Sequence, residues 1–391
     1  MSKRDRESHT FHEIVPAPIY FLKHMNWLLF GVFLSILIML VEIDGAAQER
    51  AKFEPPAGRQ LLIIGQDLGA IGGFAAPDNA GYVDHLDLKP GGVTTYTSLP
   101  YLQGLDQQVN YGSGDICAQH ILDNPIYADS VLAIGLYLVG QEKSIAGGEQ
   151  DEKIRSLAKW IKKTHRPVFL RIGFEFDGSW NHYDPTSYKP MFRRIVSIFS
   201  EMHVDNCATV WQASASPANG NNNKAINDWY PGDEFVDWIG FSCFLTGPRQ
   251  FHLTDKVLAF ARAHHKPLMV CESTPEGYDN LNLTKRNTGA GDGKPGENSK
   301  PKTPEEIWNE WYAPFFDYIE KNKDTIKVVA YINVNWDVQS LWAPPYRQGY
   351  WGDTRVEVNP VIKAKWIQMI SQSKWMLASP SLFSDLGFTR N

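Results

Sequence analysis

The sequence has few cysteines, four among 391 residues, and none lies in a CxxC pair or at a Cys/His spacing typical of a metal site. A structural zinc ion needs several ligands at short spacings, so we expect no metal. The glycines between residues 69 and 73 lack the G-x-G-x-x-G spacing of a dinucleotide site, and no cofactor is expected. Cys243 and Cys271 lie near the ends of neighbouring expected strands, so a disulfide is conceivable, but we favour four buried free thiols.

An excess of basic residues is also lacking, since 38 Lys and Arg face 44 Asp and Glu, which gives a formal net charge of −6. The charges are spread along the chain without a basic stripe, so a nucleic-acid partner is not expected. Aromatic residues are plentiful instead, with 13 Trp and 16 Tyr. Flat aromatic faces are common platforms for sugar rings, so the composition favours a carbohydrate partner.

The N-terminal segment contains a long apolar run, residues 27–41, which follows several basic residues. Its length is near the upper end of a signal-peptide core and short for a membrane span. Gly45, Ala46 and Ala47 offer a cleavage site before Gln48, so residues 1–47 are either a cleaved signal peptide or an uncleaved anchor. Either alternative predicts export, to the periplasm, to the medium or to the outer face of the inner membrane.

Eight short β-rich runs alternate with helix-period segments after a Pro/Gly-bearing linker at residues 48–58. This alternation is typical of parallel βαβ units, and eight of them predict one (β/α)8 TIM barrel, residues 59–375, followed by a tail at 376–391. We expect a monomer. The expected strands are 60–66, 92–97, 130–138, 167–175, 208–213, 236–244, 267–272 and 327–336. Apolar residues three or four apart mark helices between them, as at Ile154, Leu157, Ala158 and Ile161, and at Phe192, Ile195, Val196 and Phe199.

One insertion interrupts the pattern between the seventh strand and its helix. Residues 280–301 are rich in Gly, Lys and Asn and have no apolar period, which predicts a flexible loop. The next helix should begin at Thr303, because Thr303, Pro304 and Glu306 form the sequence of a capping box with proline at the first helical position.

Two expected strands end in glutamate, at Glu175 and at Glu272. Alternate residues of the fourth strand are apolar through Phe174 and should face the helices, which leaves Arg171 and Glu175 directed toward the barrel interior. Active sites of such barrels lie at the C-terminal ends of the strands, so the two glutamates can meet there. The alternative is that each glutamate only ends a strand and pairs with a surface lysine.

Paired carboxylates are what the cleavage of a glycosidic bond requires. One carboxyl protonates the leaving oxygen while the other attacks the anomeric carbon or activates water. Glu175 would need a raised pKa to act as the acid, and Glu272 would stay ionised beside Arg171.

The residues around Glu175 resemble a motif of glycoside hydrolase family 26, which reads Arg, two residues, His-Glu, two residues, Gly, one residue, Trp. Arg171, Glu175, Gly178 and Trp180 match it in register. Residues 230–240 are similar to the family's segment before the sixth strand, and residues 266–272 to its nucleophile strand. Trp336 lies where the wider clan has an aromatic floor for the sugar. The resemblance extends over residues 61–370 and implies a retaining glycosidase, with Glu175 as acid/base and Glu272 as nucleophile, acting most often on β-mannan and also on β-xylan or mixed-linkage glucan.

Three departures from the family pattern concern specificity. Phe174 stands where the family has His, Phe244 where it has Tyr, and the strand around Tyr137 lacks the His and Trp that mannan-cleaving members use. The two phenylalanines offer no hydrogen bond to a sugar. We therefore expect unsubstituted β-mannan to be a poor substrate and a bacterial exopolysaccharide a better one. The alternative function is a polysaccharide-binding or assembly protein with weak catalysis on the same fold.

Further aromatic and polar residues fall at expected strand ends. Further expected substrate contacts carry less weight, because about half of such residues simply pack; they are Trp211, Trp342, Tyr346, Tyr350 and Trp351. Gln66, Asp67 and Asp115 occupy rim positions, where we expect the two aspartates to cap turns.

Overall fold

The computed structural model describes residues 50–74, 81–216, 225–287 and 299–390. The predicted targeting segment, residues 1–47, lies outside them. Within the described ranges, no helix is both long and apolar enough to cross a membrane.

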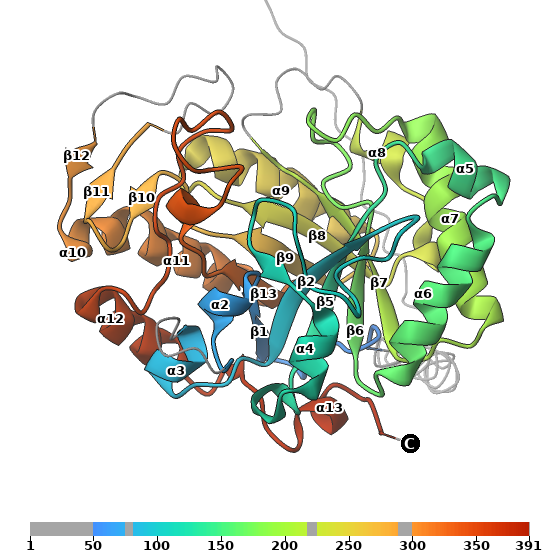
Figure 1. Ribbon diagram of the computed structural model, residues 1–391, viewed down its shortest axis with the longest axis horizontal. Coiled ribbons are helices and arrows are strands. Elements are labelled where there is room, and N and C mark those ends of the chain that lie inside the picture. Colours follow the sequence, from blue (N-terminus) through green and yellow to red (C-terminus); the bar gives the residue numbers. More distant parts are fainter. Residues whose placement is uncertain (1–49, 75–80, 217–224, 288–298, 391) are drawn as a thin grey trace, which may run out of the picture. The chain divides into compact units, whose positions relative to one another are not determined.

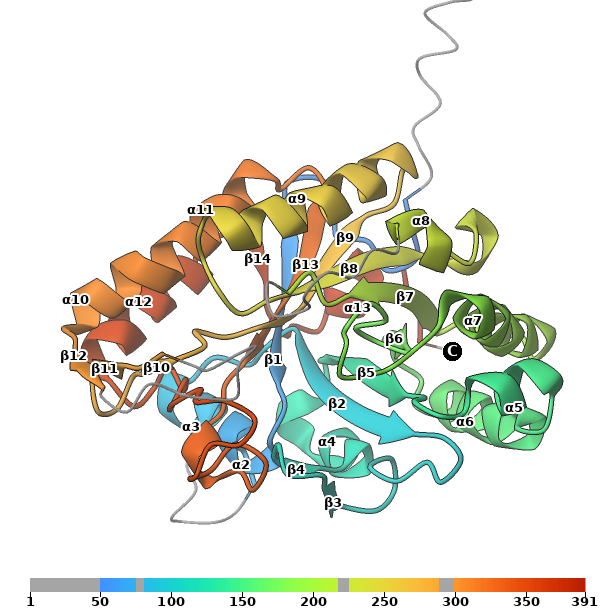
Figure 2. The same ribbon diagram turned by 90° about the horizontal axis from the view of Figure 1, so that it is seen from above.

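Eight parallel strands close into the predicted barrel (Figures 1 and 2). Each strand pairs with the next along the chain, and the last returns to the first through the register Leu61 to Val328. All eight sequence runs correspond to strands, because strands covered on both faces are nearly continuous apolar runs. Their bounds are β1 Gln60–Gly65, β2 Gly92–Ser98, β5 Val131–Tyr137, β6 Val168–Ile172, β7 Cys207–Ala213, β8 Trp238–Cys243, β9 Leu268–Ser273 and β13 Ile326–Ile332.

Helices surround the barrel, as Figure 2 shows from above. The longer ones are α4 Ala118–Asp123, α5 Glu142–Gly147, α6 Asp151–Lys163, α7 Pro185–Glu201, α9 Pro248–Ala263, α11 Ala313–Lys321 and α12 Pro360–Ile370. Shorter ones are α2 Leu68–Ile71, α3 Tyr82–Leu86, α8 Ile226–Trp229, α10 Pro304–Ile307 and α13 Leu382–Asp385, and a π-helical turn, Trp308–Tyr312, joins α10 to α11. The predicted apolar face of α6 is buried, and the capping box of Thr303 and Glu306 opens α10 as predicted.

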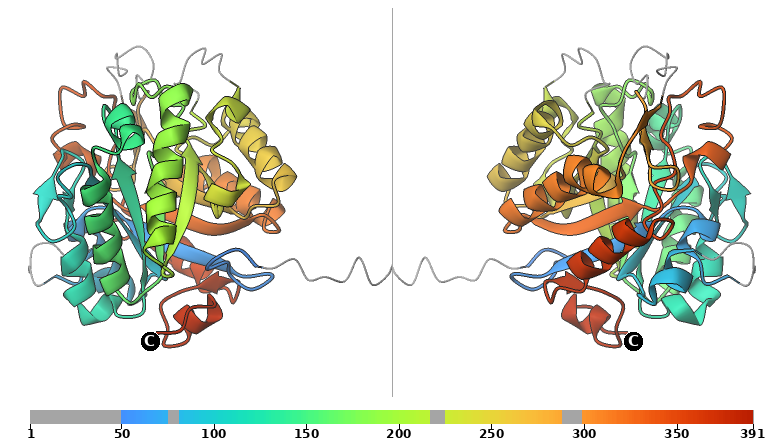
Figure 3. Two further views of the ribbon diagram at one scale, coloured as in Figure 1. Left: turned by 90° about the vertical axis from the view of Figure 1, so that its right-hand side faces the viewer. Right: turned by 90° about the vertical axis from the view of Figure 1, so that its left-hand side faces the viewer.

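Side chains inside the barrel form a second apolar layer, separate from the layer between strands and helices. The residues before β1 and after α12 close its N-terminal end, where Phe53 packs edge-on against Phe169 of β6 at 5.9 Å between ring centroids. The indole of Trp238 donates a hydrogen bond to the carbonyl of Lys52. Strand β14 (Trp375–Met376) pairs with β1, and α13 lies at the same end (Figure 3). The expected linker and tail thus contribute to the core.

Two small sheets lie at the opposite, C-terminal end of the barrel. Strands β3 (Val109–Asn110) and β4 (Asp115–Ile116) form a hairpin after β2. Strands β10 (Tyr278–Asp279), β11 (Thr284–Lys285) and β12 (Lys300–Pro301) form an antiparallel sheet after β9. The insertion is therefore not a loop throughout, as its described ends are paired; residues 288–298 lie outside the described part.

All four cysteines are free and buried, so the favoured alternative to a Cys243–Cys271 disulfide is confirmed.

Candidate active site

The segment after β6 places Glu175 at the C-terminal end of the barrel. The strand stops at Ile172 because Gly173 adopts the left-handed conformation (φ +56°), where a Cβ would lie 2.9 Å from the ring of Tyr188. The strand alternation therefore ends there, and Phe174 turns toward Tyr96 of β2 instead of facing the helices as predicted. Asn181 donates hydrogen bonds to the carbonyls of Phe174 and Glu175, which holds the turn.

The Glu175 carboxyl group is buried and accepts two hydrogen bonds. The Ser242 hydroxyl donates to Oε1 at 2.7 Å, and the Trp180 indole donates to Oε2 at 2.9 Å. Burial and then the charge of Glu272 raise the pKa of Glu175 to about 8, although the hydrogen bonds from Ser242 and Trp180 lower it. This is the direction that the sequence analysis requires of a general acid, because the group keeps its proton at neutral pH.

Glu272, in β9, is buried to the same extent but has a cationic partner. Arg171 lies 2.5 Å from its Oε1 in a buried ion pair, and the Tyr96 hydroxyl donates to the same oxygen at 3.0 Å. Arg171 is fully buried, and its guanidinium also lies 4.9 Å from the ring centroid of Tyr96 and 5.3 Å from that of Phe174. A buried guanidinium without partners would be costly, so these contacts offset its desolvation and fix it beside Glu272.

Two polar residues link the carboxyl groups into one network. Gln212 of β7 accepts a hydrogen bond from Arg171 and donates to Ser242, which in turn donates to Glu175. A register shift after Phe241 aligns Ser242 with Glu272 across β8 and β9. The site thus offers one protonated carboxyl and one ion-paired carboxyl at the same end of the barrel, the two groups that acid-assisted nucleophilic displacement needs.

Comparisons with known proteins show which family the chain is similar to. The model of glycosyl hydrolase family 26 matches residues 138–272, a range that includes both glutamates. A β-1,3-xylanase named TXYA from Vibrio sp. is 34% identical over 330 residues, which cover 84% of this chain and 68% of the relative. A β-1,3-xylanase from Alcaligenes sp. is also 34% identical over 330 residues, 84% of this chain and 67% of its own.

The chain belongs to glycosyl hydrolase family 26. It is therefore a glycoside hydrolase that acts on β-linked polysaccharides. Solved structures of low identity share its fold. One is the family 26 β-mannanase BoMan26A of Bacteroides ovatus, with a TM-score of 0.51 and 14% identity over 84% of this chain and 93% of that chain. Another is an endo-β-1,4-mannanase of Cellulomonas fimi, with a TM-score of 0.55 and 13% identity over 83% of this chain and 74% of that chain.

Trp211 does not reach the site of this family 26 protein, so its predicted contact with substrate is wrong. Its side chain is fully buried on the helix side of β7 and stacks on Phe176 at 4.4 Å between ring centroids. Side chains alternate along a strand, so Gln212 takes the inward position and Trp211 the outward one.

Trp336 and Phe244 belong to an aromatic cluster at the same barrel end. Trp336 is 3% exposed, and Trp342 and Trp351 pack on it at 5.5 and 5.1 Å between ring centroids, while Phe244 packs on Trp351 at 4.8 Å. Nearly all of the Trp336 ring is thus covered by its neighbours. Its predicted sugar contact, like that of Phe244, stays a prediction.

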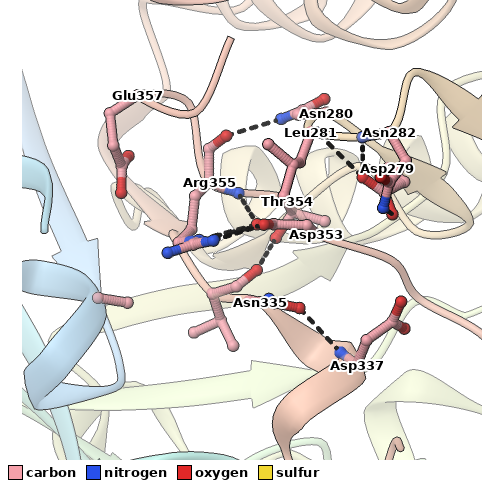
Figure 4. Close-up of polar contacts among 12 residues, drawn as sticks. Asp279, Asn280, Leu281, Asn282, Asn335, Asp337, Asp353, Thr354, Arg355 and Glu357 are labelled. Atoms are coloured by element: carbon pink, nitrogen blue, oxygen red, sulfur yellow. Dashed lines mark hydrogen bonds and ion pairs between the residues drawn. The ribbon is translucent and has the colours of Figure 1, made fainter. Parts of the chain in front are cut away.

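Polar contacts connect the segments after β9 and β13 (Figure 4). Asn280 donates its backbone N–H to the carbonyl of Asp353 and its side-chain amide to that of Arg355. Arg355 forms an ion pair with the buried Asp353 at 2.6 Å, as Figure 4 shows. Burial raises the pKa of nearby Asp337 to about 6, and the charges of Asp279 and Asp353 act in the same direction.

Of the two aspartates expected to cap turns, Asp67 caps α2, whereas the side chain of Asp115 bonds across the hairpin of β3 and β4. Asp67 accepts hydrogen bonds from the backbone of Ala70 and Asp115, as expected for a capping residue, while Asp115 accepts one from Asn110. Within the described ranges, no group of three or more His, Cys, Asp or Glu side chains is arranged to hold a metal ion.

Tyr96, Gln212 and Ser242 were missed by the sequence analysis. The latter two are polar residues near the C-terminal ends of otherwise apolar strands, a signal that could have identified them. Tyr96 resembles a core aromatic in sequence, and only the fold brings its hydroxyl to Glu272.

Proposed function

We propose that this enzyme hydrolyses β-1,3-xylan with retention of configuration, using Glu175 as acid/base and Glu272 as nucleophile. The observation that carries the proposal is the contrast between the two carboxyl groups. Glu175 is buried with a raised pKa, while Glu272 is paired with Arg171 in the same hydrogen-bond network. A buried carboxyl group with a raised pKa can act as the general acid, and a carboxyl group held beside a guanidinium can act as the nucleophile.

In the first step, the Glu272 carboxylate attacks the anomeric carbon as the bond to the leaving sugar oxygen breaks, and Glu175 gives its proton to that oxygen. In the second step, Glu175, now ionised, takes a proton from water. The water oxygen bonds to the anomeric carbon, and Glu272 leaves as a carboxylate. Hydrogen bonds from Ser242 and Trp180 stabilise Glu175 while it is ionised between the steps.

The choice of β-1,3-xylan rests on the names of the two relatives that are 34% identical to this chain. It also suits the site, because the apolar Phe174 lies next to Arg171 where the family pattern has histidine. Xylose lacks the exocyclic hydroxymethyl group of mannose and glucose, so fewer sugar hydroxyls need a protein partner. Burying a hydroxyl without a partner is costly, which disfavours a hexose beside Phe174.

A panel of polysaccharides tests the substrate. The full chain is incubated with β-1,3-xylan, β-1,4-xylan, β-1,4-mannan and mixed-linkage glucan, and reducing ends are measured. We expect β-1,3-xylan to give the highest kcat/KM and initial products with the β-anomeric configuration. An equal or higher kcat/KM on mannan would contradict the substrate, and binding without any cleavage would support the polysaccharide-binding alternative.

Two variants test the roles of the glutamates on whichever polysaccharide is cleaved. Glu272→Ala should abolish turnover, and azide should partly restore it with inverted products, because a small anion replaces the missing nucleophile. Glu175→Ala should spare aryl glycosides whose leaving group needs no proton. Full activity of either variant on the polysaccharide would show that the assignment is wrong.

A further inference from the structure

Exposed large apolar side chains gather at one end of the barrel. In the described ranges, every such side chain follows a barrel strand and precedes the next α-helix, except Tyr137, which is the last residue of its strand. Tyr101, Trp180 and Leu341 are among the others. This is also the end at which Glu175 and Glu272 lie. A polymeric substrate would contact the part of this apolar surface that lies beside the catalytic pair, whereas side chains farther out on the loops would not touch it.

One of these side chains is connected to the catalytic pair by a row of ring contacts. Tyr96, whose hydroxyl donates to Glu272, packs on Phe174 with ring centroids 5.5 Å apart, and Phe174 packs on Tyr137 at 6.3 Å. The exposure rises along the row. Tyr96 and Phe174 are partly buried, whereas Tyr137, the last residue of β5, is 43% exposed.

Arg171 anchors the inner end of the row. Its guanidinium lies 4.9 Å from the ring centroid of Tyr96 and 5.3 Å from that of Phe174, and it is itself held by Glu272 and Gln212. The inner rings are therefore fixed relative to the carboxyl groups. Tyr137 lies two ring contacts away from Tyr96, a span comparable with a short oligosaccharide.

We propose that Phe174 and Tyr137 form a stacking platform for the sugar units next to the cleavage point, with Tyr137 binding a unit that lies outside the catalytic pair. The flat apolar faces of pyranose rings pack on aromatic rings without requiring a hydrogen-bond donor at each contact. The proposal takes the cleavage point from the proposed function, but it does not depend on which β-linked sugar is cleaved.

Tyr137→Ala tests the platform on oligosaccharides of increasing length cut from the polysaccharide that the wild type cleaves. We expect KM to rise about tenfold or more on the polymer and on long oligosaccharides, since loss of a contact worth about 1.4 kcal/mol changes affinity tenfold. The shortest substrate that is still cleaved does not reach Tyr137 and should keep its kcat/KM. An equal loss at every length, or no loss at any length, would overturn the proposal.

Three further variants separate the ring from other effects. Tyr137→Phe keeps the ring and should behave as the wild type, while Tyr137→Leu keeps apolar bulk without a flat face and should resemble Tyr137→Ala. Tyr101→Ala removes a tyrosine that is 76% exposed at the same end, on the loop after β2, and should leave KM unchanged. A wild-type KM for Tyr137→Leu, or an equal rise for Tyr101→Ala, would contradict the assignment.

The same series distinguishes this inference from the proposed substrate. If the wild type cleaves another β-glycan in place of β-1,3-xylan, the substrate proposal fails and the length series on that glycan still decides the role of Tyr137. If β-1,3-xylan is cleaved and Tyr137→Ala matches the wild type at every length, only the platform fails.

Discussion

The protonation of Glu175 is coupled to folding, because its pKa rises from 4.5 to about 8 on burial. Below about pH 4.5 the carboxyl is protonated in both the folded and the unfolded chain. As the pH rises toward 8, the unfolded chain loses this proton and the folded chain keeps it, so the free energy of unfolding falls. The fall can approach about 1.4 kcal/mol per pH unit.

Glu175→Gln removes this titration and keeps a side chain that can accept from Ser242. We expect its melting temperature to exceed that of the wild type by an amount that grows between pH 5 and pH 8 and then levels off. Thermal melts across this range measure it. A difference that is the same at every pH would contradict the raised pKa.

Glu306 is a matched control, because its pKa is shifted in the opposite direction. Hydrogen bonds from Thr303 hold the pKa of Glu306 below its usual range, so its carboxylate stabilises the fold at neutral pH. The melting temperature of Glu306→Gln should therefore show no gain over that of the wild type as the pH rises.

Single residues of the site could be predicted where strand geometry decides their direction. Arg171 lies where alternation and the C-terminal end of a barrel place it. Glu272 instead has the parity of the helix-facing Leu268 and Val270, and it reaches the site through the register shift between β8 and β9. Phe174 could not be predicted, because the left-handed Gly173 breaks the alternation one residue earlier. Trp211 was assigned to the site for its residue type, although its position next to the inward Gln212 directs it to the helices.

At the scale of elements, the eight strands could be predicted to within a few residues because each is an apolar run between turn signals. Their C-terminal bounds were the least accurate. The run expected to end at Trp336 stops as a strand at Ile332. Beyond it, the side-chain amide of Asn333 donates to the carbonyl of Ala70, and Asn335 forms a β-bridge with Asp353. These contacts join segments far apart in the sequence, so no local pattern predicts them.

The loops after β9 and β13 meet at Gly352, which makes this glycine a test of their contact. It has φ +81°, and a Cβ there would lie 2.3 Å from the carbonyl oxygen of Tyr278. Its carbonyl accepts a hydrogen bond from Trp336, and the carbonyl of Trp351 accepts one from Gly277. Gly352→Ala should therefore lower both the stability and kcat/KM, because the clash with backbone displaces the tryptophan cluster.

Gly58→Ala is the matched control. Gly58 has φ +75° with open space around its Cβ position, so this variant has only the cost of the left-handed conformation, about 1–2 kcal/mol. Urea unfolding should show a clearly larger loss for Gly352→Ala, with kcat/KM reduced in that variant alone. Equal losses in the two variants would mean that the loops do not meet as described.

At the scale of the whole barrel, the two ends have different compositions. The C-terminal end holds the carboxyl pair and the exposed aromatic residues, whereas the N-terminal end is closed by apolar side chains from both flanking segments, among them Phe53, Phe383 and Leu386. Proline and glycine at residues 55–58 indicate a linker in the sequence. They cannot show that Phe53 packs inside the barrel, since its partner Phe169 is more than a hundred residues away.

Phe53→Ala tests whether stability and catalysis are separate at the two ends. Phe53 is 4% exposed and contacts the rings of Phe169 and Phe388, so its truncation should leave a cavity and cost about 3–5 kcal/mol. Because Phe169 lies near the start of β6 and Glu175 follows its end, kcat should be unchanged at temperatures where the variant is folded. Denaturant unfolding gives the stability and initial rates give kcat. A fall in kcat in the fully folded variant would show that packing at the closed end positions the carboxyl groups, and the two ends would then act as one unit.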